Sequence, residues 1–242
     1  MRKLDGIFFD VDDTLYSSTE FARKARRNAC RAMIAAGLDY PEDKLFEELE
    51  DVISEFSSNY EQHFDKLLLR IPQTACRNCT PAILIASAVV AYHNTKHREM
   101  FPYEDAVNLL ERLARVKGLV RGIITAGKTV KQAEKIVRLG LAKYLTPRAV
   151  FITEETGITK QNPKLYLLAC ERFSLDPGRT MYVGDNPEAD VDAPNEAGMI
   201  TVLHRRDGKH RDKESRTRPD YVINNHYDLM DILVEDFGLP LY

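Results

Sequence analysis

The stretch that decides the fold is LDGIFFDVDDTL, residues 4–15 of a chain of 242 residues. Its continuous apolar run Ile7–Phe9 is typical of a strand that is buried on both faces of a parallel sheet. Asp10 and Asp12 stand directly after the run, where such a strand ends. The stretch therefore predicts a central strand, Leu4–Asp10, that carries carboxylates at its end.

From residue 102 onward, strand and helix patterns alternate along the chain. This alternation predicts a doubly wound α/β sheet with helices on both faces. The charged segment 204–218 shows no periodicity, and we expect it to be a surface loop. The expected strands are 120–125, 149–153, 180–183, 199–203 and 221–223, and the expected helices are 103–116, 129–139, 163–173, 188–197 and 226–237.

Between the first strand and residue 102, the apolar pattern is helical and no strand pattern interrupts it. An insertion of this length is enough for a small separate domain. We therefore expect a catalytic core formed by residues 1–16 and 102–242, and an all-helical cap formed by residues 17–101. The expected helices of the cap are 20–36, one that begins at Pro41, 61–70 and 81–97.

Chemically reactive side chains stand near the ends of the expected strands. Thr125 ends the second strand, Lys160 lies in the loop after the third, and Asp185 follows the fourth, with Asp190 close behind it. In open α/β sheets, ligands bind in the crevice outside the carboxyl ends of the strands. We therefore expect these four side chains to converge with the aspartates that follow the first strand.

Several carboxylates in one crevice require a cation, because they repel one another and lose hydration there. Mg²⁺ suits such a site, since it prefers oxygen ligands and usually keeps positions for water and phosphate. We expect Asp10 and Asp185 to be direct ligands, with the backbone carbonyl of Asp12 as a third. Asp190 is expected to act through water.

Phosphoryl transfer gives the first two carboxylates different tasks. Asp10 and Asp12 are two residues apart near a strand end, so they can project toward the same side. Asp10 would attack phosphorus to form an acyl-phosphate, and Asp12 would protonate the leaving alkoxide and later deprotonate the hydrolytic water. Thr125 would donate a hydrogen bond to a phosphoryl oxygen, and Lys160 would neutralise the nucleophile and the transferring group.

Four segments in this order, DVDDTL, ITAG, KQNP and GDNPEAD, resemble the four motifs of the haloacid dehalogenase superfamily. The resemblance covers nearly the whole chain, including a helical insert between the first and second motifs. It implies a Rossmann-like core with a mobile cap. The roles that it implies are Asp10 as nucleophile, Asp12 as acid and base, Thr125 and Lys160 as phosphoryl ligands, and Asp185 and Asp190 as residues of the magnesium site.

Two positions depart from the pattern of this family. Ala126 stands where many relatives carry Asn or Asp, so a side-chain contact is lost while the backbone N–H is kept. Gln161 and Asn162 follow Lys160 where relatives often carry Pro and Asp. We expect the second departure to affect the loop rather than the chemistry.

The resemblance implies a magnesium-dependent phosphatase that hydrolyses a small phosphorylated metabolite through an aspartyl-phosphate. A haloacid dehalogenase is one alternative, but it displaces halide and needs neither magnesium nor an acid such as Asp12. A phosphomutase would use the same aspartyl-phosphate on a sugar phosphate and stays open. A non-enzymatic phospho-acceptor module also clusters acids, Thr and Lys on a doubly wound sheet, but its acceptor Asp lies on a later strand and it lacks a helical insert.

The cap is expected to select the substrate. Its segments 58–63 and 92–97 concentrate polar groups and are similar to cap segments of archaeal-type phosphatases of the superfamily. Within them, His63, His93 and Lys96 offer donors that a sugar or a carboxylate would need. The alternative is that these residues are surface groups or take part in packing within the cap.

The composition gives no reason to expect nucleic acid, since the formal net charge is −3. No apolar stretch approaches the roughly 18 residues of a membrane span, and the first apolar run is too short for a signal peptide. We therefore expect a cytoplasmic monomer or homodimer without membrane or nucleic-acid partners. Cys76 and Cys79 form a lone C-x-x-C with no further zinc ligands nearby, so we expect a loop with two free thiols, with a redox or metal role as the alternative.

Overall fold

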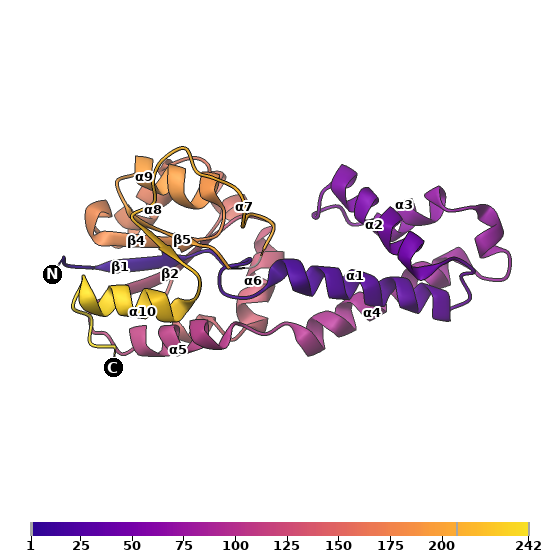
Figure 1. The fold of residues 1–242 in the computed structure, drawn as a ribbon, viewed down its shortest axis with the longest axis horizontal. Coiled ribbons are helices and arrows are strands. Elements are labelled where there is room, and N and C mark those ends of the chain that lie inside the picture. The colour runs from indigo at the N-terminus through magenta and orange to yellow at the C-terminus, as the bar shows by residue number, and fades with distance from the viewer. Residues whose placement is uncertain (1, 207, 242) are drawn as a thin grey trace. The chain divides into compact units, whose positions relative to one another are not determined.

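The computed structural model of the chain describes residues 2–206 and 208–241 (Figure 1). The chain forms two compact units. The larger consists of Met1–Thr19 and Phe101–Tyr242, and the smaller consists of Glu20–Met100. No helix among the described residues is both long and apolar enough to cross a membrane.

Among the described residues, six strands form one sheet in the larger unit, and every neighbouring pair is parallel. Their order across the sheet is β3-β2-β1-β4-β5-β6, which places β1 between β2 and β4. This arrangement belongs to the doubly wound α/β class that the sequence predicts. The strands are β1 (Gly6–Phe9), β2 (Val120–Thr125), β3 (Val150–Ile152), β4 (Thr180–Gly184), β5 (Ile200–His204) and β6 (Tyr221–Ile223).

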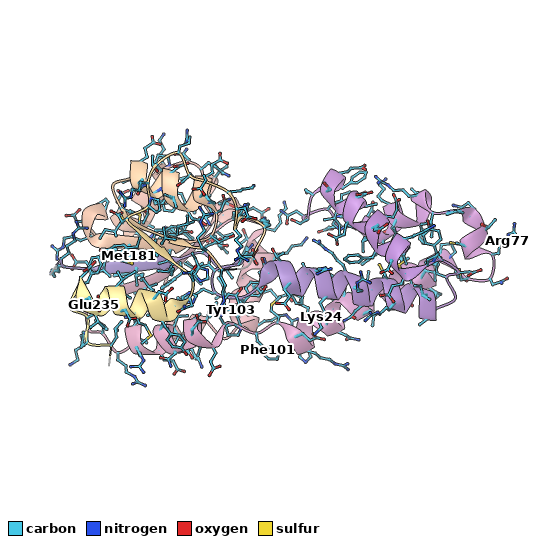
Figure 2. The ribbon with its side chains drawn as sticks, in the orientation of Figure 1. Lys24, Arg77, Phe101, Tyr103, Met181 and Glu235 are labelled. Atoms are coloured by element: carbon cyan, nitrogen blue, oxygen red, sulfur yellow. The ribbon has the colours of Figure 1, made fainter. Side chains whose placement is uncertain are left out.

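Helices cover both faces of the sheet (Figure 1). On one face, Phe8 packs in a core shared with α8 (Lys164–Arg172) and α9 (Ala193–Glu196). On the other lie α5 (Glu104–Leu113) and α10 (His226–Glu235), which pack on each other. Burial from both sides explains why the residues of β1 are continuously apolar. Two residues labelled in Figure 2 illustrate the difference between the sheet and the outer surface of a helix. Met181 of β4 is buried, whereas Glu235 at the end of α10 is exposed.

Two elements of the larger unit differ from the sequence prediction. Thr153, expected to end a strand, instead begins the short helix α7 (Thr153–Thr156). The expected helix 188–197 is divided, because a π-helical turn, η4 (Pro187–Asp192), precedes α9. The remaining elements of this unit are α6 (Thr129–Arg138), η2 (Ala142–Tyr144) and η3 (Pro177–Arg179).

The smaller unit is helical throughout its described residues and has an apolar core of its own. Met33, Leu49, Leu67 and Leu84, one from each of its α-helices, are buried in that core. Cys76 and Cys79 lie in this unit as free thiols. The elements are α1 (Ser18–Ala35), α2 (Glu42–Phe56), α3 (His63–Arg70), η1 (Gln73–Cys76) and α4 (Pro81–Glu99).

Candidate active site

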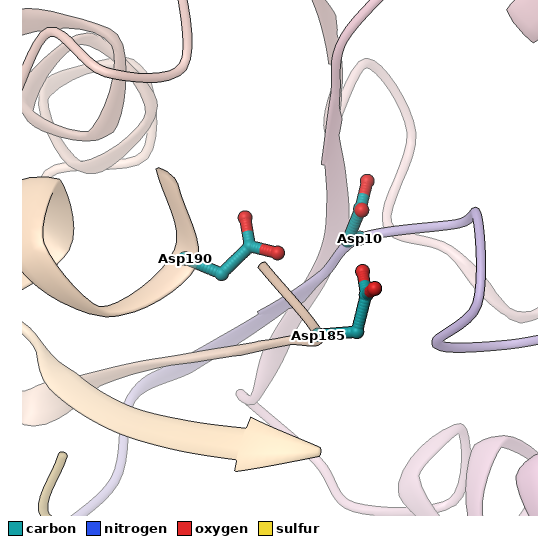
Figure 3. A group of neighbouring side chains, drawn as sticks. All are labelled: Asp10, Asp185 and Asp190. Atoms are coloured by element: carbon teal, nitrogen blue, oxygen red, sulfur yellow. The ribbon is translucent and has the colours of Figure 1, made fainter. Parts of the chain in front are cut away.

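Three aspartates gather at the carboxyl edge of the sheet (Figure 3). Asp10 follows β1, Asp185 follows β4, and Asp190 lies on η4. Each contributes one carboxylate oxygen to a group whose members all lie within 4.8 Å of one another. All three side chains are buried, so they form a compact acidic cluster with little access to bulk water.

The order of the strands explains this convergence. Phe9 of β1 pairs with Val183 of β4, and the N–H of Asp10 donates to the carbonyl of Val183 at 2.9 Å. The residues that follow the two strands therefore lie side by side. A Cβ added to Gly184 would lie 2.3 Å from Oδ2 of Asp190, so the missing side chain of Gly184 makes room for this carboxylate.

The π-helical turn η4 fixes the third carboxylate. The N–H of Asp190 donates to the carbonyl of Asn186, and the N–H of Asn186 donates to Oδ2 of Asp190 at 2.9 Å. This reciprocal pair turns Asp190 back toward the end of β4. Single π-helical turns are rare and occur frequently at functional sites.

Lys160 lies between two of these aspartates and is itself buried. Its Nζ is 3.1 Å from Oδ1 of Asp10 and 2.6 Å from Oδ1 of Asp190. Burial disfavours the ammonium form, but the charges of Asp10 and Asp190 outweigh it and raise the pKa of Lys160. The site therefore holds a permanent cation beside the predicted nucleophile.

One ammonium does not compensate three carboxylates, and the pKa values show the excess. Burial raises the pKa of Asp10 to about 6, with Lys160 opposing this shift and the charge of Asp190 adding to it. Burial also raises the pKa of Asp185 to about 9, and the charges of Asp190 and Asp10 add to it. Without a further cation, burial and mutual repulsion oppose ionisation of these carboxyl groups. A bound cation would stabilise their ionised forms.

The residues present fit a magnesium ion. Oδ2 of Asp185 is buried and has no hydrogen-bond partner among the described residues. The donor set consists of carboxylate oxygens, which Mg²⁺ prefers. The hydroxyl of Thr125, which lines the cavity beside the cluster, is likewise buried without a partner in the described chain, so it can donate to an oxygen of a bound group.

A cavity of ≈ 130 Å³ opens beside the cluster, within the larger unit. Five of the six core residues predicted from the sequence line it, and the sixth, Asp190, belongs to the acidic cluster described above. Two further lining residues, Lys209 and His210, come from the segment 204–218, which the sequence led us to expect as a plain surface loop. The predicted residues that line the cavity are Asp10, Asp12, Thr125, Lys160 and Asp185.

Asp12 is held by three side chains that sequence reasoning missed. Lys135 Nζ lies 2.7 Å and 2.6 Å from Oδ1 and Oδ2 of Asp12. The hydroxyl of Tyr16 donates to Oδ1 at 2.7 Å, and Nε2 of Gln132 donates to Oδ2 at 3.2 Å. Burial raises the pKa of Asp12, but Lys135 and these hydrogen bonds outweigh it and bring the pKa below the ordinary 3.8. Asp12 therefore rests as a carboxylate.

The predicted substrate residues of the cap lie in the smaller unit. His63 begins α3, and its Nε2 lies 2.8 Å from the carbonyl oxygen of Ser57. His93 and Lys96 lie on α4, where His93 is exposed and its ring stands 6.0 Å from that of Tyr92. Their role toward a substrate stays a prediction.

Comparisons with known proteins identify relatives of this chain. The chain is 43% identical to a glyceraldehyde 3-phosphate phosphatase of Methanopyrus kandleri, with 96% of this chain and 98% of that protein covered. It is 37% identical to a protein of the same name from Methanocaldococcus jannaschii, with 95% and 97% covered. Among solved structures, a HAD phosphatase of Thermococcus onnurineus has a TM-score of 0.65 at 22% identity, covering 96% of this chain and 98% of that one, which shows the shared fold.

The family follows from the chain as a whole. Residues 4–198 match the haloacid dehalogenase-like hydrolase family, and this range holds the strand-end residues of all four motifs. The fold class and the family predicted from the sequence are confirmed. This chain belongs to the haloacid dehalogenase-like hydrolases.

Proposed function

We propose that the chain is a magnesium-dependent phosphatase that hydrolyses a small phosphate monoester, with glyceraldehyde 3-phosphate as the first candidate substrate. The observation that carries the proposal is the contact of Asp10 with Lys160, 3.1 Å apart, beside the acidic cluster and the cavity. It combines a candidate nucleophile, a fixed cation and a place for a divalent metal. The candidate substrate comes from the names of the two curated relatives.

In the first step, a carboxylate oxygen of Asp10 forms a bond to phosphorus while the bond from phosphorus to the leaving oxygen breaks. Lys160 favours the ionised form of Asp10 and offsets charge on the transferring group. The hydroxyl of Thr125 donates to a phosphoryl oxygen. Mg²⁺ held by Asp10 and Asp185 would supply positive charge to the phosphoryl oxygens.

Asp12 handles the protons of both steps. In its protonated form it gives its proton to the leaving alkoxide, and it later takes a proton from the water that attacks phosphorus, which restores the protonated form. The bond between phosphorus and Asp10 then breaks, which releases inorganic phosphate and restores the carboxylate. Asp190 holds Lys160 in place through its 2.6 Å ion pair.

Phosphate release from a panel of phosphorylated metabolites by the purified protein with Mg²⁺ tests the proposal. We expect turnover of at least one triose phosphate and its complete loss in Asp10→Asn. Asp51→Asn, an exposed aspartate of α2, is the matched control and should keep wild-type rates. Halide release from haloacids without phosphate release would contradict the proposal, as would undiminished turnover in Asp10→Asn.

The roles of Asp10 and Asp12 can be distinguished by trapping the phosphoenzyme intermediate. Asp12→Asn keeps the nucleophile, so an aryl phosphate with a good leaving group should still phosphorylate the protein, and the phosphoenzyme should decay slowly. Mass spectrometry of acid-quenched samples detects the added phosphoryl group. Phosphoenzyme in Asp10→Asn would rule out Asp10 as the nucleophile.

A further inference from the structure

Residues 205–206 and 208–218, which follow β5, form an anchored segment. Nη1 of Arg206 donates to both carboxylate oxygens of the buried Asp105, at 2.9 Å each. The same guanidinium lies 3.9 Å from the ring centroid of Tyr103. The contact of Arg206 with Asp105 is charge-assisted, which makes it stronger than a hydrogen bond between neutral groups. The start of the segment is therefore held in one orientation.

The other end of the segment is fixed as well. The backbone N–H groups of Arg216 and Thr217 donate to the carboxylate of Asp192, at 3.1 Å and 2.7 Å. Within the segment, Nη1 of Arg205 donates to the carbonyls of Arg211 and Lys213. Backbone hydrogen bonds to a buried side chain restrict the path of a loop more than surface ion pairs do. The described residues of the segment are therefore held in place on the larger unit.

At Gly208 the segment packs closely against the loop that follows β1 and begins with Asp10. A Cβ added to Gly208 would lie 3.1 Å from both Cβ and Cγ of Asp13, so a side chain at this position would crowd the aspartate. The close approach delivers the next two residues, Lys209 and His210, to the cavity that Asp10 lines.

The groups that these two residues present have no task in the chemistry proposed above. Lys160 already neutralises the nucleophile, and the hydroxyl of Thr125 already offers a donor to a phosphoryl oxygen. Nδ1 of His210 is buried without a hydrogen-bond partner among the described residues. Lys209 is exposed and adds a second cation at the rim of the cavity. Both therefore suit acceptor oxygens that lie beyond the phosphoryl group.

We propose that Lys209 and His210 bind the leaving-group side of the substrate, so that the core itself discriminates between phosphate esters. The inference rests on the proposed phosphatase function. The substrate class that fits is a small phosphate monoester whose carbon skeleton carries hydroxyl, carbonyl or carboxylate oxygens close to the ester oxygen. An ester without such oxygens leaves the buried Nδ1 of His210 without a partner and gains nothing from the exposed Lys209, so the site should prefer the oxygenated ester.

The test compares esters that share the phosphoryl group and differ in the leaving group. The full-length protein with Mg²⁺ is assayed on glycerol 3-phosphate, on 3-phosphoglycerate and on propyl phosphate, which has no further oxygen. The readout is the preference, the kcat/KM of an oxygenated ester divided by that of propyl phosphate. We expect this ratio to fall roughly 10- to 100-fold in Lys209→Met and to fall in His210→Phe as well.

Lys213→Met is the matched control, because Lys213 is an exposed lysine of the same segment and does not line the cavity. It should keep the wild-type preference. A larger fall for 3-phosphoglycerate than for glycerol 3-phosphate in Lys209→Met would identify a carboxylate as the group that Lys209 binds. An equal fall on all three esters would show that Lys209 serves the phosphoryl group, and this outcome overturns the inference. An unchanged preference in both variants overturns it too.

A binding measurement keeps the inference separate from the proposed function. In Asp10→Asn protein, the affinities for glycerol 3-phosphate and propyl phosphate are measured by calorimetry, with and without Lys209→Met. The ratio of the two affinities should fall in the double variant by a similar factor. If wild-type protein releases phosphate from no ester, the proposed function fails, while the affinity ratio still decides whether Lys209 recognises the leaving-group side.

Discussion

The ammonium of Lys135 lies 2.6 Å and 2.7 Å from the two carboxylate oxygens of Asp12, so the proposed acid and base rests in an ion pair. The pair is formed across the fold, from α6 to the loop after β1. Asp12 must therefore take up a proton against the field of Lys135 before it can serve a leaving group.

Replacing Lys135 with Met should change the pH profile. Lys135 favours the ionised form of Asp12, so its removal raises the pKa of Asp12 and moves the alkaline limb of kcat/KM to higher pH. The loss of positioning should lower kcat roughly 10- to 100-fold for esters with poor leaving groups, a part of what general acid catalysis contributes. Aryl phosphates should suffer less. Lys117→Met, at an exposed lysine, is the control, and an unmoved alkaline limb would contradict this role of Lys135.

Magnesium binding should release protons. Because burial raises the pKa of Asp185 to about 9, this carboxyl is protonated at neutral pH in the metal-free protein and must ionise to bind the ion. Calorimetry in buffers of different ionisation enthalpy should show release of on the order of one proton per ion at about pH 7. Affinity should increase as the pH rises. Binding heats that do not depend on the buffer would contradict this, and Asp185→Asn should release fewer protons.

The same pKa values determine how the stability of the metal-free protein changes with pH. Both Asp10 and Asp185 have folded-state pKa values above the ordinary 3.8, so the stabilisation that protonation of the folded state provides is complete below that value. It is lost as the pH rises through about 6 and about 9. Metal-free protein should therefore lose stability across this range, and Mg²⁺ should restore it.

Thermal unfolding of metal-free Asp185→Asn measures this effect, because asparagine cannot ionise. Its Tm should exceed that of the wild type by an amount that grows as the pH rises from about 6 to about 9, with about 1 kcal/mol corresponding to roughly 2–4 °C in a chain of this size. A Tm difference that is constant across the range would show that the charge of Asp185 is not the cause.

The cap residues allow a separate test of specificity. If His63, His93 and Lys96 contact the substrate, alanine at each should lower kcat/KM sharply for the best metabolite and little for an aryl phosphate. Rates are compared across the same panel of esters. If all three replacements leave the substrate ranking unchanged, these residues are packing or surface groups of the smaller unit.

The sequence predicted the central sheet and the convergence of the six candidate residues at its edge because both depend on local signals. The run Ile7–Phe9 is typical of a buried strand, and each motif residue lies at the end of a strand or in the connection that follows it. Parallel strands bring such positions to one edge whatever the detailed packing. The division of 188–197 into η4 and α9 was out of reach, since it depends on the contact of Asp190 with the end of β4.

The partners of Asp12 show what local signals leave out. Gln132 and Lys135 are three residues apart on α6, and in the sequence they are indistinguishable from a solvated helix face. Their role follows only from the docking of α6 beside the loop after β1. Lys209 and His210 offered one usable signal, because they follow β5 at the same edge of the sheet as the other strand-end residues. The absence of periodicity in 204–218 led to the segment being read as an ordinary loop.

The central place of β1 has a consequence for how the molecule can change over time. The backbone of Asp10 is hydrogen-bonded to β4 in the middle of the sheet, so its amide should exchange with solvent only when the larger unit opens as a whole. Lys209 lies instead in the connection after β5 and is exposed, so its own replacement alters few buried contacts. If Lys209 binds the leaving-group side as proposed, mutations at this position can change which esters such a protein prefers without altering the residues that break the phosphate ester bond.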